Sequence, residues 1–281
     1  MELLVTKKWV AVALLAVLAF AGVACGSDEP TTPTTGATDD GMEEPTFTTL
    51  EDGVLTVGSD IPYPPFEFRK QGELVGLDMD LINEIATRLG LTTNIIDTGF
   101  DTIFTQLAGG RYDVVIAAST ITPEREEQVN FSDPYYNAQQ SLTVQSGGEV
   151  QSVDDLGDGH TVAVQSGTTG KAWAEDNLPD GVEIRSFPEG PDGYTALEAG
   201  EVDGVINDEP TALAEVAGRE GLEVIETIDT DEAYGIAVDP ENEELLDAVN
   251  AALAEIIEDG TYAEIYAAYP DLPPGGNVAE G

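Results

Sequence analysis

Positively charged side chains are scarce in this chain of 281 residues, which has 10 Lys and Arg against 55 Asp and Glu. Arg125, in the segment ITPER, is therefore a candidate for binding an anion. Its planar guanidinium can hold a carboxylate through two parallel hydrogen bonds. The alternative is an exposed arginine that balances its acidic neighbours Glu124, Glu126 and Glu127.

Two further sets of polar residues stand where α/β proteins bind ligands. Thr168 and Thr169, in SGTTG, precede an expected helix and offer hydroxyls and unpaired backbone N–H groups to a carboxylate. Ordinary N-capping by threonine is the alternative, and both roles can hold together. Asp208, in INDEP, follows an expected strand at 203–207, and open parallel sheets bind ligands at the carboxyl ends of their strands. In so acidic a chain, the alternative for Asp208 is a solvated surface residue.

The composition excludes several classes of protein. A formal net charge of −45 would repel a phosphate backbone, so we expect no nucleic-acid binding. A single Cys, Cys25, rules out an internal disulfide framework, and a single His, His160, disfavours a zinc site or a Ser/His/Asp triad. We therefore predict no metal, no cofactor and no catalytic residues. With 41% hydrophobic residues, the chain can still form folded cores.

The N-terminal segment has the order of an export signal. Lys7 and Lys8 precede an apolar run at 9–21, and small residues then lead to Cys25. The segment resembles a bacterial lipoprotein signal, in which the exposed Cys25 receives a lipid, although Gly22 stands where such signals usually have Leu. An ordinary cleaved signal with an incidental cysteine is the alternative. We predict a signal peptide over 1–24.

Both ends of the mature chain lack periodicity. Residues 25–50 are rich in Pro, Thr and acids, which predicts a disordered linker anchored at its first residue. Residues 270–281, PDLPPGGNVAEG, are predicted to form a flexible tail.

Between these ends, short apolar runs alternate with helical periodicity. Strands are predicted at 55–59, 94–96 and 113–119, with helices through 81–89 and 103–107 between them. The second half repeats the order, with strands at 161–166, 182–187 and 203–207 and helices from about 169 and through 194–197. A βαβαβ order predicts a parallel sheet covered by helices, and two such units predict two α/β lobes.

The repetition extends to single residues. Five residues recur 90 positions later: Leu107, Gly110, Asp113, Val115 and Ile116 as Leu197, Gly200, Asp203, Val205 and Ile206. The alternative is that this spacing is a common way to end a helix with Gly and enter a buried strand, which predicts the same local structure. A strand at 233–238 and a helical pattern at 241–269 follow the second unit. Their return to the first lobe predicts a two-stranded hinge.

Six segments show a more specific pattern: VGSDIPYPPFEF (57–68), GELVGLDMDLINEIATRLG (72–90), DVVIAASTITPEREEQVNFSDPYY (113–136), VAVQSGTTG (162–170), GEVDGVINDEP (200–210) and YGIAV (234–238). In this order they resemble family 3 solute-binding proteins, the amino-acid receptors of ABC importers. The resemblance implies the two-lobed periplasmic-binding-protein (Venus-flytrap) fold, type II-like, with a two-stranded hinge. It implies lobe 1 at 51–143 and 233–269, and lobe 2 at 144–232.

The resemblance also implies how a free amino acid would be bound. A zwitterion needs a cation for its carboxylate, an anion for its ammonium and a dry place for its side chain. The implied carboxylate partners are Arg125, Thr168 and Thr169. The implied ammonium partners are Asp208, Thr120 and the backbone of Ala118. The implied neighbours of the ligand side chain are Tyr63 and Phe100, although either ring could be plain core.

The side-chain preference of the ligand follows from a loop that similar receptors use for this purpose. Asp60 and Glu67 lie in it, and carboxylates favour a basic or polar side chain over an acidic one. Glu67 could instead be a structural part of PFEF. An open form would bind the amino acid through Arg125, and closure would add Thr168, Thr169 and Asp208.

The expected protein is an extracytoplasmic, membrane-anchored monomer that delivers its amino acid to an ABC permease and its ATPase. One alternative is a dehydratase on the same scaffold, with Glu67 or Asp60 as general acid. The other is the ligand-sensing partner of a membrane receptor. The acidity has no role in binding, and we interpret it as an adaptation to a saline environment that screens the charges.

Overall fold

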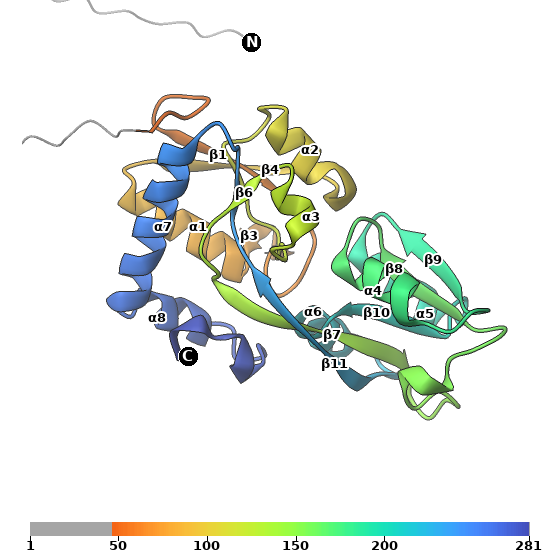
Figure 1. Cartoon of the computed structure of the whole chain (residues 1–281). Helices are drawn as coiled ribbons and strands as arrows, with labels where there is room; N and C mark the ends of the chain where they lie inside the picture. The colour runs from red at the N-terminus through yellow and green to blue at the C-terminus, as the bar shows by residue number, and fades with distance from the viewer. Residues whose placement is uncertain (1–46, 281) are drawn as a thin grey trace, which may run out of the picture. The chain divides into compact units, whose positions relative to one another are not determined.

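The computed structural model describes residues 47–280, and the predicted signal peptide, Cys25 and most of the predicted linker lie outside them. The described part contains two five-stranded sheets, with strand orders β4-β1-β5-β12-β6 and β11-β7-β10-β8-β9, flanked by helices (Figure 1). Within residues 47–280, no helix is long and apolar enough to cross a membrane.

The first sheet combines parallel strands with one returning strand. β1 (Val54–Ser59) pairs in parallel with β4 (Thr92–Asp97) and β5 (Val114–Val115). β12 (Ala237–Val238) comes from much later in the chain and pairs antiparallel with β5 and β6 (Asn130–Phe131). A small hairpin, β2 (Phe68–Lys70) and β3 (Glu73–Val75), leads into the first helix.

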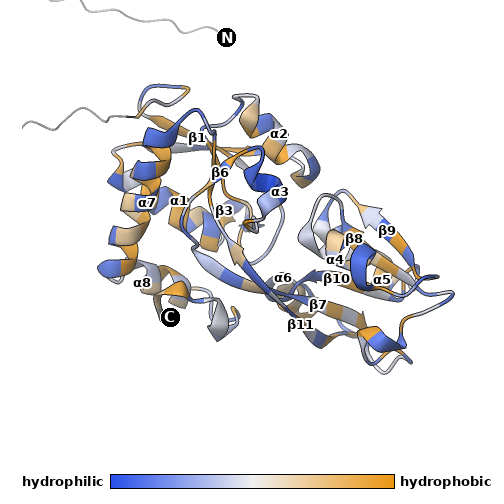
Figure 2. Cartoon of the chain, viewed as in Figure 1, coloured by the Kyte–Doolittle hydropathy of each residue, from blue (hydrophilic) through white to orange (hydrophobic). Residues whose placement is uncertain are grey.

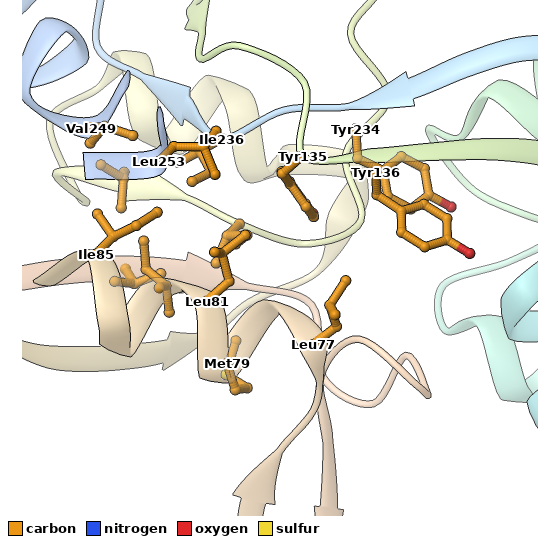
Figure 3. Packing of buried hydrophobic residues seen from close by; sticks show 14 of the residues in the cluster. Leu77, Met79, Leu81, Ile85, Tyr135, Tyr136, Tyr234, Ile236, Val249 and Leu253 are labelled. Atoms are coloured by element: carbon orange, nitrogen blue, oxygen red, sulfur yellow. The ribbon is translucent and has the colours of Figure 1, made fainter. Parts of the chain in front are cut away.

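Helices lie against both faces of this sheet. α1 (Leu77–Arg88) packs against α7 (Glu243–Glu258) and α8 (Thr261–Ala267), while α2 (Ile103–Ala108) packs on β1 and β5. Figure 3 shows Leu81 and Ile85 of α1 facing Ile236, Val249 and Leu253 across the core, and all five are almost fully buried. Figure 2 shows hydrophilic and hydrophobic residues alternating along α7, as expected for a helix that buries one face.

The second sheet repeats the parallel unit. β8 (Thr161–Gln165) pairs in parallel with β9 (Glu183–Phe187) and β10 (Gly204–Asp208). α4 (Thr169–Asn177), α5 (Gly190–Glu198) and α6 (Glu209–Ala217) pack on it. Val162 and Val164 face the core that includes α4, and Ala163 between them faces the core that includes α5. The sheet is therefore covered by helices on both faces, as the sequence predicts.

Two long strands connect the sheets. β7 (Tyr136–Gln145) and β11 (Leu222–Tyr234) pair antiparallel, from Tyr136 beside Tyr234 to Gln145 beside Leu222. They run from the first sheet into the second (Figure 1), which agrees with the predicted two-stranded hinge. The pairing shifts register between Val224 and Glu226 and again between Ile228 and Glu232. The residue limits proposed for the lobes stay a prediction.

The corner that recurs at an interval of 90 residues has the same geometry in both lobes. Gly110 and Gly200 both lie in the left-handed region, with φ of 71° and 70°. Asp113 and Asp203 each accept a hydrogen bond at 2.7 Å from a backbone N–H of the neighbouring parallel strand. The left-handed turn requires glycine, and the carboxylate then joins the turn to the sheet.

Two predicted elements are divided in the structure. Of the strand predicted at 113–119, only Val114–Val115 are paired as a strand, because the chain leaves the sheet and Ala118 adopts φ of 43°. The helical pattern at 241–269 forms α7 and α8, which are separated at Gly260 with φ of 87°. Both breaks are backbone turns that apolar periodicity does not reveal.

The ends of the described chain pack on lobe 1. Leu272 is 5% exposed, and Asn277 forms an isolated bridge with Tyr136, next to the short helices η3 (Pro274–Gly276) and η4 (Val278–Glu280). This packing differs from the flexible tail predicted for 270–281. At the other end, the Leu50 N–H, in the predicted linker, donates to Asp113 at 2.7 Å. Leu272 at one end and Phe47 at the other pack with the hydrophobic core of lobe 1, which the composition of the two segments alone does not show.

Candidate functional site

A cavity lies between the two lobes and brings together all nine ligand-binding residues predicted from the sequence. It is lined by Asp60, Tyr63, Phe100, Ala117, Ala118, Thr120, Arg125, Gln165, Thr168, Thr169 and Asp208. Ala117 and Gln165 are additional to the prediction. A larger, more open cleft adjoins it and shares Phe100, Arg125, Thr168 and Thr169. That these residues bind a ligand stays a prediction.

The fold explains why these residues meet. Asp60 follows the carboxyl end of β1, and Thr120 lies beyond β5 in the same sheet. In the second lobe, Thr169 begins α4 after β8, and Asp208 ends β10. The carboxyl ends of the parallel strands in both sheets therefore border one cavity, which is the usual ligand position in open α/β sheets.

Arg125 is buried and has no acidic partner among the described residues. Its side chain belongs to the short helix α3 (Pro123–Glu126), and the residue is 8% exposed. Nη1 donates to the carbonyl oxygen of Thr120 at 2.7 Å, and Nη2 to that of Gly167 at 3.2 Å. The guanidinium carbon lies 5.1 and 5.0 Å from the ring centres of Phe100 and Phe104. No ion pair within 4.0 Å involves it in residues 47–280, and burial lowers the pKa of the guanidinium.

This geometry decides between the two interpretations of Arg125. An exposed arginine that balances neighbouring acids is wrong, because the side chain points into the cavity. A buried guanidinium whose partners are two neutral carbonyls keeps a net positive charge available for an anion.

Asp208 is the opposite charge in the cavity. It is 5% exposed and accepts hydrogen bonds from Gln140 and the Tyr234 hydroxyl. Burial, with Glu232 as a nearby negative charge, raises the pKa of Asp208 to about 7. The alternative of a solvated aspartate is therefore wrong, and a cation in the cavity would favour the ionised form.

The Thr168 hydroxyl makes both of its hydrogen bonds within its own lobe. Its hydroxyl donates to the carbonyl oxygen of Gln165 at 2.9 Å and accepts from the N–H of Lys171 at 3.1 Å, as an N-cap does. Thr169 is different, because its hydroxyl donates to Glu232 at 2.8 Å. The capping alternative thus describes the Thr168 hydroxyl, while Thr169 points to the interior.

Asp60 connects the lobes, whereas Glu67 lies elsewhere. Gln165 Nε2 donates to Asp60 at 2.6 Å across the cavity, and burial raises the pKa of Asp60 to about 7. Glu67 does not line the cavity; it is completely buried beside Asp78. Its structural interpretation is therefore the correct one.

Glu67 and Asp78 form a buried carboxyl pair behind the cavity. Apart from Asp78, neither Glu67 oxygen has a hydrogen-bond partner in the described part of the chain. Asp78 Oδ2 accepts from the N–H of Ala118 at 2.8 Å and from the Tyr135 hydroxyl at 2.9 Å. Burial raises the pKa of Asp78 to about 7 and that of Glu67 well above its usual value, so the pair holds a proton. Asp78, through its bond to the Ala118 N–H, holds the left-handed turn at Ala118, which lines the cavity.

Sequence reasoning missed two residues on the hinge strands. Glu232 on β11 accepts from Thr120 at 2.7 Å and from Thr169 at 2.8 Å, and so contacts both lobes. Gln140 on β7 donates through Nε2 to Asp208 and to Glu232, the latter at 3.1 Å. Glu232 lies in the acidic strand β11, LEVIETIDTDEAY, where no local signal separates it from the other acids.

The described residues contain no group of three or more His, Cys, Asp or Glu placed to hold a metal ion. The charged groups that line the cavity are the Arg125 guanidinium and the carboxyl groups of Asp60 and Asp208. Such a site can bind a small molecule that has both an anionic and a cationic end.

Comparisons with known proteins agree with this chemistry. The family described as bacterial extracellular solute-binding proteins, family 3, matches residues 55–271. The L-cystine-binding protein TcyJ of Escherichia coli (strain K12) is 34% identical over 215 residues, covering 75% of this chain and 80% of that protein. The ABC transporter arginine-binding protein 1 of the same strain is 32% identical over 217 residues, covering 75% and 88%.

A solved structure extends the likeness to the fold. An ancestral arginine-binding protein bound to glutamine superposes with a TM-score of 0.75 at 39% identity, covering 78% of this chain and 98% of that chain. The two-lobed α/β fold class is thus confirmed. Both curated relatives are named as binding proteins, and neither is named as an enzyme.

Proposed function

Because this chain belongs to family 3 of the bacterial extracellular solute-binding proteins, we propose that it is the substrate-binding component of an amino-acid ABC importer. It captures a free L-amino acid between its lobes and delivers it to a membrane permease and its ATPase. The observation that supports this proposal is Arg125, a buried guanidinium without an acidic partner among the described residues, in one cavity with Asp208.

The two ends of an amino acid match the two charges of the cavity. The ligand carboxylate accepts from the Arg125 guanidinium, which can replace one of its carbonyl contacts by a stronger charged pair. The ligand ammonium lies against Asp208, Thr120 and the carbonyl of Ala118. Arg125 and Asp208 are then each paired with an opposite charge, which removes the free-energy cost of a buried unpaired charge.

The rest of the cavity favours a basic or polar side chain. Asp60 with its partner Gln165 provides a carboxylate and an amide, and Tyr63 and Phe100 provide aromatic faces. A guanidinium, ammonium or amide can donate to Asp60 and stack on a ring, whereas an acidic side chain would face a like charge.

Closure contributes to binding because the contacts come from both lobes. Arg125 and Asp60 belong to the first lobe, and Asp208 and Thr169 to the second. A ligand that touches both sets binds the closed form better and shifts the equilibrium toward it. Two hydrogen bonds already join the lobes, from Gln165 to Asp60 and from Arg125 to the Gly167 carbonyl. They reduce the binding free energy that the ligand must supply to hold the lobes closed.

Calorimetry with the twenty standard amino acids tests the proposal. Wild-type protein is expected to bind at least one basic or polar amino acid. Arg125→Ala should lose about 2–5 kcal/mol of binding free energy, because the ligand carboxylate is left unpaired in a closed cleft. Arg185→Ala is the matched control, since its side chain is 45% exposed on β9 and pairs with Glu201. Undiminished affinity in Arg125→Ala would refute the assignment.

Lipid attachment at Cys25, membrane anchoring and the monomeric state are further parts of the proposal. Labelling of expressing cells with a clickable fatty acid should mark the wild type and not Cys25→Ser. A labelled Cys25→Ser protein would exclude this attachment site. Of the two acids considered for a dehydratase, Glu67 is outside the cavity, which weakens that alternative further.

A further inference from the structure

We propose that Glu232 is a positioning residue that selects for the ammonium group of the ligand. It fixes the hydrogen-bond direction of the Thr120 and Thr169 hydroxyls, so that both oxygens act as acceptors toward the cavity. This inference deepens the proposed function and rests on it.

The position of Glu232 follows from an irregularity in the hinge. The pairing of β11 with β7 shifts register between Ile228 and Glu232, and such bulges commonly re-aim a side chain. Glu232 Oε2 lies 2.7 Å from Thr120 Oγ1 in the first lobe and 2.8 Å from Thr169 Oγ1 in the second. Its other oxygen accepts from Gln140 Nε2 at 3.1 Å. One carboxylate on the hinge therefore holds a hydroxyl from each lobe.

A count of protons gives the direction of these bonds. An ionised carboxylate can only accept, and a hydroxyl has a single hydrogen and two lone pairs. Both threonine hydrogens must then point at Glu232. The 3.5 Å contact between Thr120 Oγ1 and Thr169 Oγ1 consequently has no hydrogen left to share. Neither hydroxyl can donate to a ligand, and both keep lone pairs that can accept from one.

This direction assigns the two ends of the ligand. An ammonium has three N–H donors and needs acceptors, which Thr120, Thr169 and Asp208 supply together. A carboxylate at the same place would meet only lone pairs and the negative charges of Asp208 and Glu232. The Thr169 hydroxyl therefore belongs to the ammonium side of the cavity, in contrast to the carboxylate role expected from the sequence. The carboxylate is left to Arg125 and backbone N–H groups.

The test compares amino acids with analogues that lack the ammonium. Because both hydroxyls bond the same oxygen, Oε2, an amide at this position could still accept from both; Glu232→Leu instead removes every acceptor at similar size, so both hydroxyl hydrogens are free to turn toward the cavity. Binding of L-arginine and L-glutamine, and of the des-amino analogues 5-guanidinopentanoate and glutaramate by competition at millimolar concentration, is measured by calorimetry. For the amino acid that the wild type binds more tightly, we expect a loss of about 10- to 100-fold. Its analogue should lose less than about threefold.

Glu223→Leu is the control, because it makes the same change on the same strand at a residue that accepts from the Gly147 N–H outside the cavity. It should leave both affinities unchanged. Thr169→Val supplies an independent variant that removes the acceptor oxygen and keeps the shape. The double variant with Glu232→Leu should lose less than the sum of the two single losses, since Glu232 acts through this hydroxyl.

Equal losses for amino acid and analogue, or no loss for either, would overturn the role of Glu232 and leave the proposed function intact. Additive losses in the double variant would do the same. A wild-type protein that binds no amino acid would overturn the proposed function, and this inference with it.

Discussion

The two lobes contain the same corner in different surroundings. In lobe 1, Asp113 is 5% exposed and accepts backbone N–H groups from Thr56 and Leu50, each at 2.7 Å. In lobe 2, Asp203 is exposed and accepts the N–H of Thr161. The difference arises because residues 47–50 cover the first corner and no corresponding segment covers the second. A repeated sequence pattern thus specifies the local turn, while the ends of the chain decide how deeply it is buried.

The same asymmetry extends to the binding site. Lobe 1 also receives β12, α7 and α8 from the far end of the chain, and it surrounds buried carboxyls at Asp60, Glu67 and Asp78. Lobe 2 supplies the start of α4 and the end of β10. The two lobes therefore contribute different parts of the cavity: lobe 1 supplies Arg125 and the buried Asp60, and lobe 2 supplies Thr169 and Asp208.

The largest expected effect concerns the pH dependence of lobe 1. Burial raises the pKa of Asp78 to about 7 and that of Glu67 well above its usual value, with Asp60 and Asp208 as further negative charges near Glu67. Tyr135, which donates to Asp78, keeps its proton over this range because burial raises its pKa. Between about pH 4 and 7, the folded protein therefore binds more protons than the unfolded chain. The stability that the pair contributes is fully present below about pH 4 and is lost as the pH rises through about 7.

Asp78→Asn tests this pH dependence. The asparagine oxygen can still accept from Ala118 and Tyr135, so the turn is kept. We expect the fall in unfolding free energy between pH 4 and 7 to become shallower by about 1.4 kcal/mol per pH unit, the value for one proton. Urea denaturation at several pH values measures it, with Asp203→Asn as the lobe 2 control. An unchanged slope in Asp78→Asn would show that this pair does not hold the proton.

The next effect compares the two corners directly. Asp113→Asn places an NH₂ group against one of two backbone N–H donors, the buried one of Thr56 or the partly buried one of Leu50, and we expect a loss of about 1–3 kcal/mol of unfolding free energy. Asp203→Asn should lose less than about 1 kcal/mol, because water can satisfy the exposed N–H. Urea denaturation of both variants gives the comparison. Losses of the same size would mean that the cover provided by residues 47–50 has no energetic consequence.

The smallest difference is expected at the glycines of the two corners. Gly110 and Gly200 have nearly identical positive φ, and an added Cβ would meet nothing within 4 Å at Gly110 and only Gln145 at 3.8 Å at Gly200. Alanine at either position should cost about 1–2 kcal/mol through backbone strain alone, and the two losses should agree closely. Thermal unfolding of the two variants measures them. A clear inequality would contradict the view that the corners share one local geometry.

The sequence predicts most of the fold because apolar periodicity reports burial. The strands at 54–59 and 161–165 and the stripe of α1 appear in the hydrophobic pattern, and the scarcity of cations singles out Arg125. The break at Gly260 and the short β5 depend on single backbone turns, which apolar spacing does not encode. Such local breaks require the tertiary structure.

The site is predictable only where its residues are unusual in their surroundings. Gln140 and Glu232 were missed because their role depends on a register shift in the hinge, and Glu232 lies in a strand with several other acids. The packing of 270–280 was missed because Pro and Gly dominate its composition. In each case the deciding contacts are long-range. Glu232 bonds residues 112 and 63 positions away, Gln140 bonds residues 68 and 92 positions away, and Asn277 bridges to Tyr136.

The bridge between Asn277 and Tyr136 has a practical consequence for protein engineering. Tyr136 is the first residue of β7, so the C-terminal segment is attached at the root of a strand that joins the two lobes. A bulky reporter protein fused after residue 281 would pull on the bridge between Asn277 and Tyr136. A biosensor built on this scaffold is better made by inserting the fluorophore into a surface turn of lobe 2, such as the one at Gly147, away from that joint.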